Sequence, residues 1–163
     1  MKKTILALSA LLLVNCIPVF AAPLNDLTTG QTAIGVDSDT FYLEHKLTNN
    51  FTLGYQDVDR GRYGSSDDIY GQFQMTNELR GIIGNRDFGS DSSVYLGLGL
   101  NGPLSPNATG YASFVASDNF KELQAGANFN IARNVDLNVN YHSFMPDAGS
   151  NENGVGVGAT LKF

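Results

Sequence analysis

The sequence contains no tryptophan and only one cysteine, Cys16, so disulfide bonds and cysteine ligands are excluded from the chain beyond that residue. After the first residues there is also no apolar run of the about 18 residues that a membrane-spanning helix needs. Basic residues are few, with 10 Lys and Arg against 16 Asp and Glu and no basic cluster. Because nucleic acid is bound mainly through positive charge, we expect no nucleic-acid partner.

The amino-terminal residues have the pattern of a secretory signal peptide. Two lysines at positions 2 and 3 precede an apolar run, 5–14, that is too short to span a bilayer. Val19 and Ala21 are the small residues that signal peptidase reads, which predicts cleavage after Ala21. We therefore expect a signal peptide over residues 1–21 and a single mature domain over residues 22–163.

Cys16 raises one alternative for this leader. The sequence Leu13-Val14-Asn15-Cys16 is close to the box at which bacterial lipoproteins are cut and lipidated. Asn15 departs from that box, which normally has Gly, Ala or Ser at this position. We therefore expect the cysteine to be removed with the signal peptide, and loss of the two lysines then changes the formal net charge from −6 to −8.

Alternation of apolar with small or polar residues predicts β-strands that have one apolar face. The last ten residues, 154–163, alternate strictly and end on an aromatic residue, Phe163. The same pattern recurs in segments of about the 9–11 residues that a tilted strand needs to cross a bilayer. It is clearest at 94–101, 122–131 and 135–142, present at 51–56 and 69–75, and weaker at 31–37, 41–47 and 79–88.

Two kinds of break separate these segments, and the two kinds take turns. Short breaks centre on Asn50, Asn77, Asn107 and Asn134, which are spaced by 27, 30 and 27 residues. Such compositions are typical of tight turns between antiparallel strands. The other breaks are acidic, and most are longer: 37–39, 57–68, 86–93, 117–119 and 143–153.

The spacing predicts a hairpin unit that repeats five times after residue 22, which gives ten antiparallel strands. The four short turns then lie at one end with both termini, and the five acidic loops lie at the other end. An eight-stranded barrel with a loose amino-terminal segment is the alternative, because 31–37 is the weakest strand.

The composition of the polar faces indicates which side of each strand faces water. Amides and charges on those faces would cost several kcal/mol per unpaired group in a dry protein core. An apolar face toward lipid removes the conflict, because closure of the barrel pairs every backbone group and leaves the polar set inside. We predict an all-β, antiparallel up-and-down transmembrane β-barrel. Its lumen is expected to be lined by Glu44, Lys46, Gln56, Gln72, Gln74, Arg80, Glu122, Asn128, Asn140 and Lys162, and its lipid face to carry Leu53, Phe73, Leu96, Leu98, Phe129, Leu137, Val139, Val157, Leu161 and Phe163.

These features together resemble the small outer-membrane β-barrel proteins of Gram-negative bacteria, of the porin-like or YfaZ-like class. The resemblance rests on the charged start with its cleavage site, the short-turn and long-loop asymmetry, and the alternation from Val155 to Phe163. It implies insertion into the outer membrane, contact with lipid and lipopolysaccharide, and recognition of the carboxy-terminal strand by the barrel-insertion machinery. It matches no particular member.

Candidate chemistry is sparse. His142 is predicted near the outer end of a strand, where it could lie across the mouth from Asp57 and Asp59, as in some outer-membrane proteases. No Asp lies two residues before His142, so we expect a polar rim residue there and no enzyme, cofactor or metal.

The strand count and the lining suggest what the barrel can do. About ten strands with a lining rich in glycine and long polar residues suggest a narrow or plugged lumen. The expected function is a narrow pore, a structural role or a surface-contact role of a monomer in the cell envelope. The alternatives are a soluble exported β-barrel or adhesin-like module, and an outer-membrane hydrolase.

Overall fold

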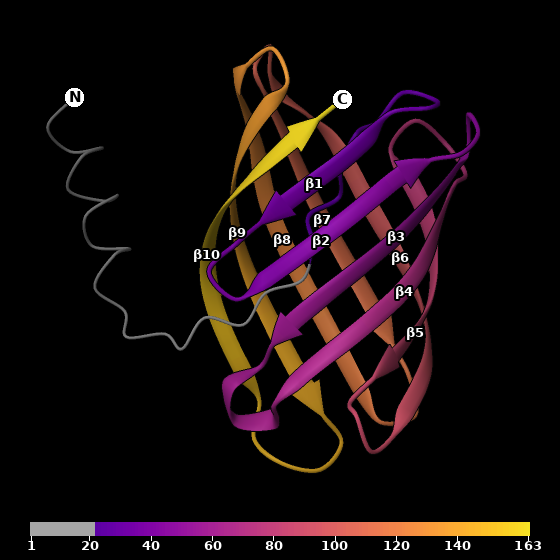
Figure 1. Cartoon of the computed structure of the whole chain (residues 1–163), viewed down its shortest axis with the longest axis vertical. Coiled ribbons are helices and arrows are strands. Elements are labelled where there is room, and N and C mark those ends of the chain that lie inside the picture. The colour runs from indigo at the N-terminus through magenta and orange to yellow at the C-terminus, as the bar shows by residue number, and fades with distance from the viewer. Residues whose placement is uncertain (1–21) are drawn as a thin grey trace, which may run out of the picture.

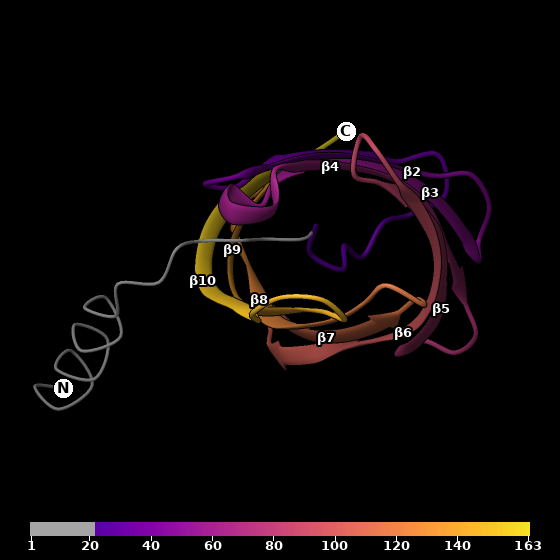
Figure 2. The same cartoon turned by 90° about the horizontal axis from the view of Figure 1, so that it is seen from below.

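The computed structural model describes residues 22–163, and this part of the chain forms a closed antiparallel β-barrel (Figures 1 and 2). The predicted signal peptide, 1–21, lies outside the described residues. The elements are β1 Thr32–Val36, β2 Thr40–Lys46, β3 Phe51–Asp59, the short 3-10 helix η1 Gly61–Tyr63, β4 Ser65–Gln74, β5 Leu79–Asp87, β6 Ser92–Ser105, β7 Ala108–Ala116, β8 Phe120–Ala132, β9 Val135–Pro146 and β10 Glu152–Lys162. Within the described range, no helix has the length and apolar character needed to cross a membrane.

Each strand pairs with its sequence neighbours, and β1 closes the ring by pairing with β10. The prediction of ten strands is therefore confirmed, and the eight-stranded alternative is wrong. β1 has only five residues, yet it pairs on both sides, with Ile34 opposite Leu43 on β2 and Leu161 on β10. Pairing on both edges supplies the stability that so short a strand lacks alone.

The two ends of the barrel differ as the turn spacing predicted. The four short turns and Phe163 lie at one end, here called the turn end, and the five remaining connections lie at the other, the loop end. The loops are shorter than expected, because strands extend into them. β3 and β4 run into the predicted loop 57–68 and leave only 60–64 between them, and β9 and β10 reduce 143–153 to 147–151.

The outward face of the wall is apolar. On β6, for example, Val94, Leu96, Leu98 and Leu100 are between 54% and 65% exposed. The twenty residues assigned above to lumen and lipid face fall on opposite sides of the wall. Eight of the ten polar ones are buried inside and the other two, Gln74 and Lys162, half-buried; the apolar ones are exposed on the exterior, with Leu137 and Val139 half-exposed. A soluble barrel would present the reverse pattern, so this exterior requires an apolar solvent.

Inward-facing glycines make room for tyrosine rings. In three cross-strand pairs a glycine lies directly opposite a tyrosine whose ring covers the glycine Cα, so that any Cβ would overlap the ring. The pairs are Gly35–Tyr42, Gly54–Tyr70 and Gly84–Tyr95. The glycine-rich lining therefore fills the lumen with aromatic rings instead of leaving it open.

Candidate functional site

The loop-end half of the lumen is filled by buried charges from four separate segments, here called the ion cluster: Arg60, Asp68, Arg86 and Glu122. Arg86 donates from Nε and Nη2 to the carboxylate of Asp68, each at 2.7 Å, and from Nη1 to Glu122 Oε2 at 2.6 Å. Arg60 Nη2 donates to the same Glu122 oxygen at 3.0 Å. Two cations and two carboxylates thus form one neutral network at most 4% exposed.

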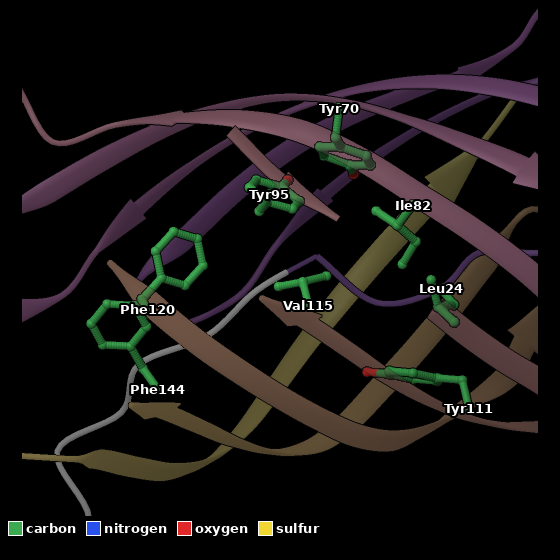
Figure 3. Packing of buried hydrophobic residues seen from close by; sticks show 8 residues of the cluster. All are labelled: Leu24, Tyr70, Ile82, Tyr95, Tyr111, Val115, Phe120 and Phe144. Carbon is green, nitrogen blue, oxygen red and sulfur yellow. The ribbon is translucent and has the colours of Figure 1, made fainter. Parts of the chain in front are cut away.

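Aromatic rings surround the ion cluster. The guanidinium of Arg60 lies 4.4 Å from the ring centroid of Phe144, and that of Arg86 lies 4.4 Å from the centroid of Phe120. Phe120 and Phe144 themselves pack at 5.6 Å between centroids (Figure 3). The rings exclude water from the network and add cation–π attraction to it.

Two loops meet over this end of the barrel. Tyr63, in η1, donates its hydroxyl to the backbone oxygen of Ser150 at 2.7 Å and accepts the Ser150 amide at 2.8 Å. These residues come from 60–64 and 147–151, the connections after β3 and β9. The pKa of Arg60, beside this contact, is lowered to about 10, first by burial and then by repulsion from Arg86. Arg60 therefore keeps its charge at neutral pH.

The other half of the lumen is occupied by the chain's own amino-terminal residues, 22–30, here called the N-terminal segment. Figure 2 shows its indigo trace running inside the ring of strands. Asn25 donates from Nδ2 to Glu44 Oε2 at 2.8 Å, and the Ala22 nitrogen donates to Gln56 Oε1 at 2.7 Å. The backbone oxygen of Asn25 accepts from Arg80 Nη1 at 2.7 Å.

Further polar contacts to the segment come from strands nearer the carboxy terminus. Asn128 on β8 donates to the backbone oxygen of Leu24 at 3.0 Å, and Lys162 on β10 donates to that of Asp26 at 3.4 Å. The Asp26 carboxylate lies 3.7 Å from Arg80 Nη2. Five of the ten residues predicted to line the lumen therefore contact the N-terminal segment directly: Glu44, Gln56, Arg80, Asn128 and Lys162.

Little space is left between these two fillings. A cavity of about 40 Å³ lies where the N-terminal segment meets the ion cluster, and Ala22, Gln56 and Glu122 are among its lining residues. That volume holds no more than a few water molecules. A polar cavity of about 210 Å³ opens near Asp26, Asp136 and Lys162, where the Lys162–Asp136 ion pair measures 2.7 Å. Both halves of the described lumen are therefore occupied by the chain's own residues.

The structure contradicts the candidate hydrolase site. His142 is fully buried inside the lumen, with Nε2 at 3.5 Å from Glu122 Oε2. Asp57 and Asp59 are exposed on the outward side of β3, where they alternate with the inward residues Gln56 and Val58. The wall of the barrel separates the histidine from both carboxylates, so they cannot share one water molecule. Among residues 22–163 there is also no group of three metal-binding side chains.

The amino-terminal filling is what sequence reasoning missed. Residues 22–30 show no alternation, and a stretch without periodicity carries no information about where it lies. The one signal available was the set of long polar residues on the inward faces, each of which needs hydrogen-bond partners inside the lumen. Arg80 illustrates this, because one of its donors goes to the backbone of Asn25.

The closed ten-stranded barrel with its apolar exterior defines the class: a small transmembrane β-barrel. No protein-family model matches the sequence, and no curated protein matches it significantly. Among solved structures it is similar to the KdgM porin (7% identity, TM-score 0.49, 82% of this chain and 98% of that one). It is also similar to the NanC porin (11%, 0.44, 82% and 99%) and to the amino-terminal barrel domain of Pseudomonas aeruginosa OprF (12%, 0.42, 83% and 98%). These similarities concern the fold and say nothing about a solute or partner of this chain.

Proposed function

We propose that this chain is an integral, non-enzymatic protein of the bacterial outer membrane whose barrel is closed at rest and serves a structural or surface-contact role. The observation that carries the proposal is the filled lumen behind an apolar exterior. Closed β-barrels are the one sheet architecture that leaves no unpaired edge in lipid, and their known bacterial location is the outer membrane.

The filling favours a closed barrel over a constitutive narrow pore. A solute would have to displace the ion cluster, whose four charges are buried and mutually paired, and then the N-terminal segment. Removing one partner of such a network exposes the others to a large desolvation cost. A permanently open pathway for ions is therefore inconsistent with this filled lumen.

The surface role is assigned to the loop end, which faces outward if the turn end, where β1 begins and Phe163 lies, faces the periplasm. Among residues 22–163, seven of the nine exposed acidic residues lie at the loop end: Asp91, Asp118 and Asp147 in the connections, and Asp57, Asp59, Asp67 and Asp87 in the adjoining strand ends. Lipid and lipopolysaccharide are the expected surroundings of the wall. β10, with the outward-facing Phe163, is the segment through which the insertion machinery would recognise the chain.

The location is tested by fractionating cells that express the full chain. We expect the protein in the outer-membrane fraction, with Ala22 as its first residue by amino-terminal sequencing, and with a gel band that moves when the sample is boiled. Recovery in the soluble periplasmic fraction would overturn the proposal, whereas a different first residue would overturn only the predicted cleavage site.

The closed state is tested by reconstituting the purified protein into planar bilayers. We expect no reproducible conductance at neutral pH, with a solved porin as the positive control. A steady single-channel conductance from protein whose gel band is fully heat-modifiable would reject the closed barrel and support the narrow pore.

A further inference from the structure

The N-terminal segment lies inside the barrel without being part of its wall. Its backbone joins the sheet only at its end, where Gly30 donates to the backbone oxygen of Lys46 at 2.8 Å. Gly30 has a φ of 83°, a conformation that favours glycine and turns the chain from the lumen into β1. The ladder between β1 and β10 closes the ring without any residue of the segment. All ten strands of the wall are therefore paired without any residue of the N-terminal segment.

The segment is nevertheless held as a specific ligand would be. Leu24, Asn25 and Leu27 are at most 4% exposed. The side chains that hydrogen-bond to it come from β2, β3, β5, β8 and β10, which surround one lumen only when the ring is closed. The binding surface therefore exists only after the barrel has closed.

Asn25 is the best-recognised residue of the segment. Its side chain donates to Glu44, whose other oxygen accepts from Tyr70 at 2.9 Å and Gln72 at 2.8 Å. Its backbone oxygen is bound by Arg80. With Tyr70 and Gln72 already donating to one oxygen, the Glu44 carboxylate is held in place as an acceptor, and an apolar residue at position 25 would leave its other oxygen without this hydrogen bond.

The apolar part of the site is shaped for a leucine. A Cβ added to Gly99 on β6 would lie 2.6 Å from Cδ1 of Leu24 and 3.5 Å from Cδ1 of Ile82. The glycine therefore provides the space that the Leu24 side chain occupies. Figure 3 shows Leu24 beside Ile82, reaching into the lumen from the segment.

We propose that the lumen is a binding site for a short extended peptide, occupied by the chain's own mature amino-terminal segment, which enters the closed barrel from the turn end. Asn25 and Leu24 are the residues the site selects, and the amino group freed by cleavage after Ala21 lies at Gln56. The segment is a separable plug that fills the half of the lumen left open by the ion cluster. This inference rests on the proposed membrane barrel and goes beyond it.

A disulfide between the segment and the wall tests the docking. Because the mature chain has no cysteine of its own, the double variant Leu24→Cys, Gly99→Cys carries only the two thiols of interest. A Cβ at position 99 would lie 2.6 Å from Leu24 Cδ1, so Leu24→Cys removes the atom that it would meet and leaves two short side chains directed at each other. We expect mild oxidation of the full-length, membrane-inserted protein to link the two positions. The control pair Leu24→Cys, Gly102→Cys should stay reduced.

Selectivity is tested in the same double variant. Adding Asn25→Ala or Glu44→Gln should slow disulfide formation by about ten-fold, since a hydrogen bond to a charged group is lost or weakened. The folded, heat-modifiable band should persist. Asn77→Ala, an exposed asparagine in a turn at the same end, should leave the rate unchanged. A synthetic peptide of sequence Ala-Pro-Leu-Asn-Asp-Leu-Thr-Thr should slow formation further in the Asn25→Ala variant.

Each result separates the plug from the barrel. If the folded band is present but positions 24 and 99 do not link, or Asn25→Ala has no effect on the rate, the binding site is rejected while the membrane barrel stands. If Asn25→Ala abolishes the folded band, the segment is part of the fold and not a separable plug. If no variant and no wild-type sample gives a folded band, the proposed function itself fails.

Discussion

The side-chain amide of Asn25 donates a hydrogen bond of 2.8 Å to Glu44, which joins a residue ahead of the first strand to the inner face of β2. Glu44 is 1% exposed and accepts three hydrogen bonds from neutral donors. Within residues 22–163 Glu44 forms no ion pair, so its carboxyl group is held by these three donors. Glu44 is therefore the carboxylate that joins the N-terminal segment to β2 and β4.

We predict that Glu44→Gln lowers the free energy of unfolding by about 1–3 kcal/mol, because an amide cannot accept from all three donors with both of its polar atoms. The measurement is the urea midpoint of the heat-modifiable band in detergent. Glu78→Gln is the matched control, since Glu78 is exposed in a turn, and it should change stability by no more than about 0.5 kcal/mol. Equal midpoints for the two variants would contradict the role given to Glu44.

The ion cluster makes a larger prediction. Glu122→Gln leaves Arg60 and Arg86 buried with Asp68 as their only carboxylate, and breaking a buried pair in this way costs about 3–5 kcal/mol. The neighbouring residue supplies the control. Lys121 pairs with Asp147 at 3.3 Å, but both side chains are 52% exposed, so Lys121→Gln should cost about 0–1 kcal/mol. Denaturant unfolding of both variants should give this order, and the reverse order would contradict it.

The glycine–tyrosine pairs predict an unusual penalty for a small substitution. A Cβ at position 54 overlaps the ring of Tyr70, so Gly54→Ala should force the ring to move and destabilise the barrel by about 1–3 kcal/mol. Gly102 has no atom within 4 Å of an added Cβ, and Gly102→Ala should be near neutral. Thermal midpoints of the heat-modifiable band compare the two. The double variant Gly54→Ala, Tyr70→Phe should be no more stable than Gly54→Ala alone, because phenylalanine keeps the ring that the added Cβ overlaps.

We expect Asp39, in the connection between β1 and β2, to make the stability of the fold depend on pH in a defined direction. Its pKa is raised above the ordinary 3.8, first by burial and then by the charges of Asp59 and Asp37. A carboxyl whose pKa is raised in the folded state destabilises the fold while ionised, so this penalty disappears as the pH falls through the raised value and is gone below 3.8.

Asp39→Asn should therefore raise the thermal midpoint slightly at pH 7, by an amount worth no more than about 0.5 kcal/mol for a group so near the surface. The difference between variant and wild type should shrink as the pH approaches 4. Differential measurement against wild type removes the effect of other titrating groups. A difference that grows on acidification would contradict the assigned cause.

Much of the fold was accessible from the sequence because its signals are local. The period of two along 154–163 determines which face of β10 meets lipid, and the regular spacing of Asn50, Asn77, Asn107 and Asn134 determines the number of strands. β1 was the weakest segment for the same reason: five residues contain too few repeats of the pattern.

The contents of the lumen were not accessible, because they depend on register and on closure. Gly54 can be recognised as space for Tyr70 only once β3 and β4 are aligned. Arg60 lies within the predicted loop 57–68, yet its side chain is buried and meets Glu122, which lies 62 residues away in the chain. Such contacts leave no periodic trace in either segment.

The membrane itself is tested by placing a charge on the outer wall. Leu98, near the middle of β6, is 55% exposed and points away from the lumen, whereas Val94 lies close to the loop-end start of the same strand. In a bilayer, Leu98→Arg should cost about 2–4 kcal/mol and Val94→Arg about 0–1 kcal/mol, because the cost of a charge on a barrel wall falls from the midplane to the interface. Reversible folding into lipid vesicles measures both. In water the two positions are equally solvated, so equal and small costs would mean that lipid does not cover this wall.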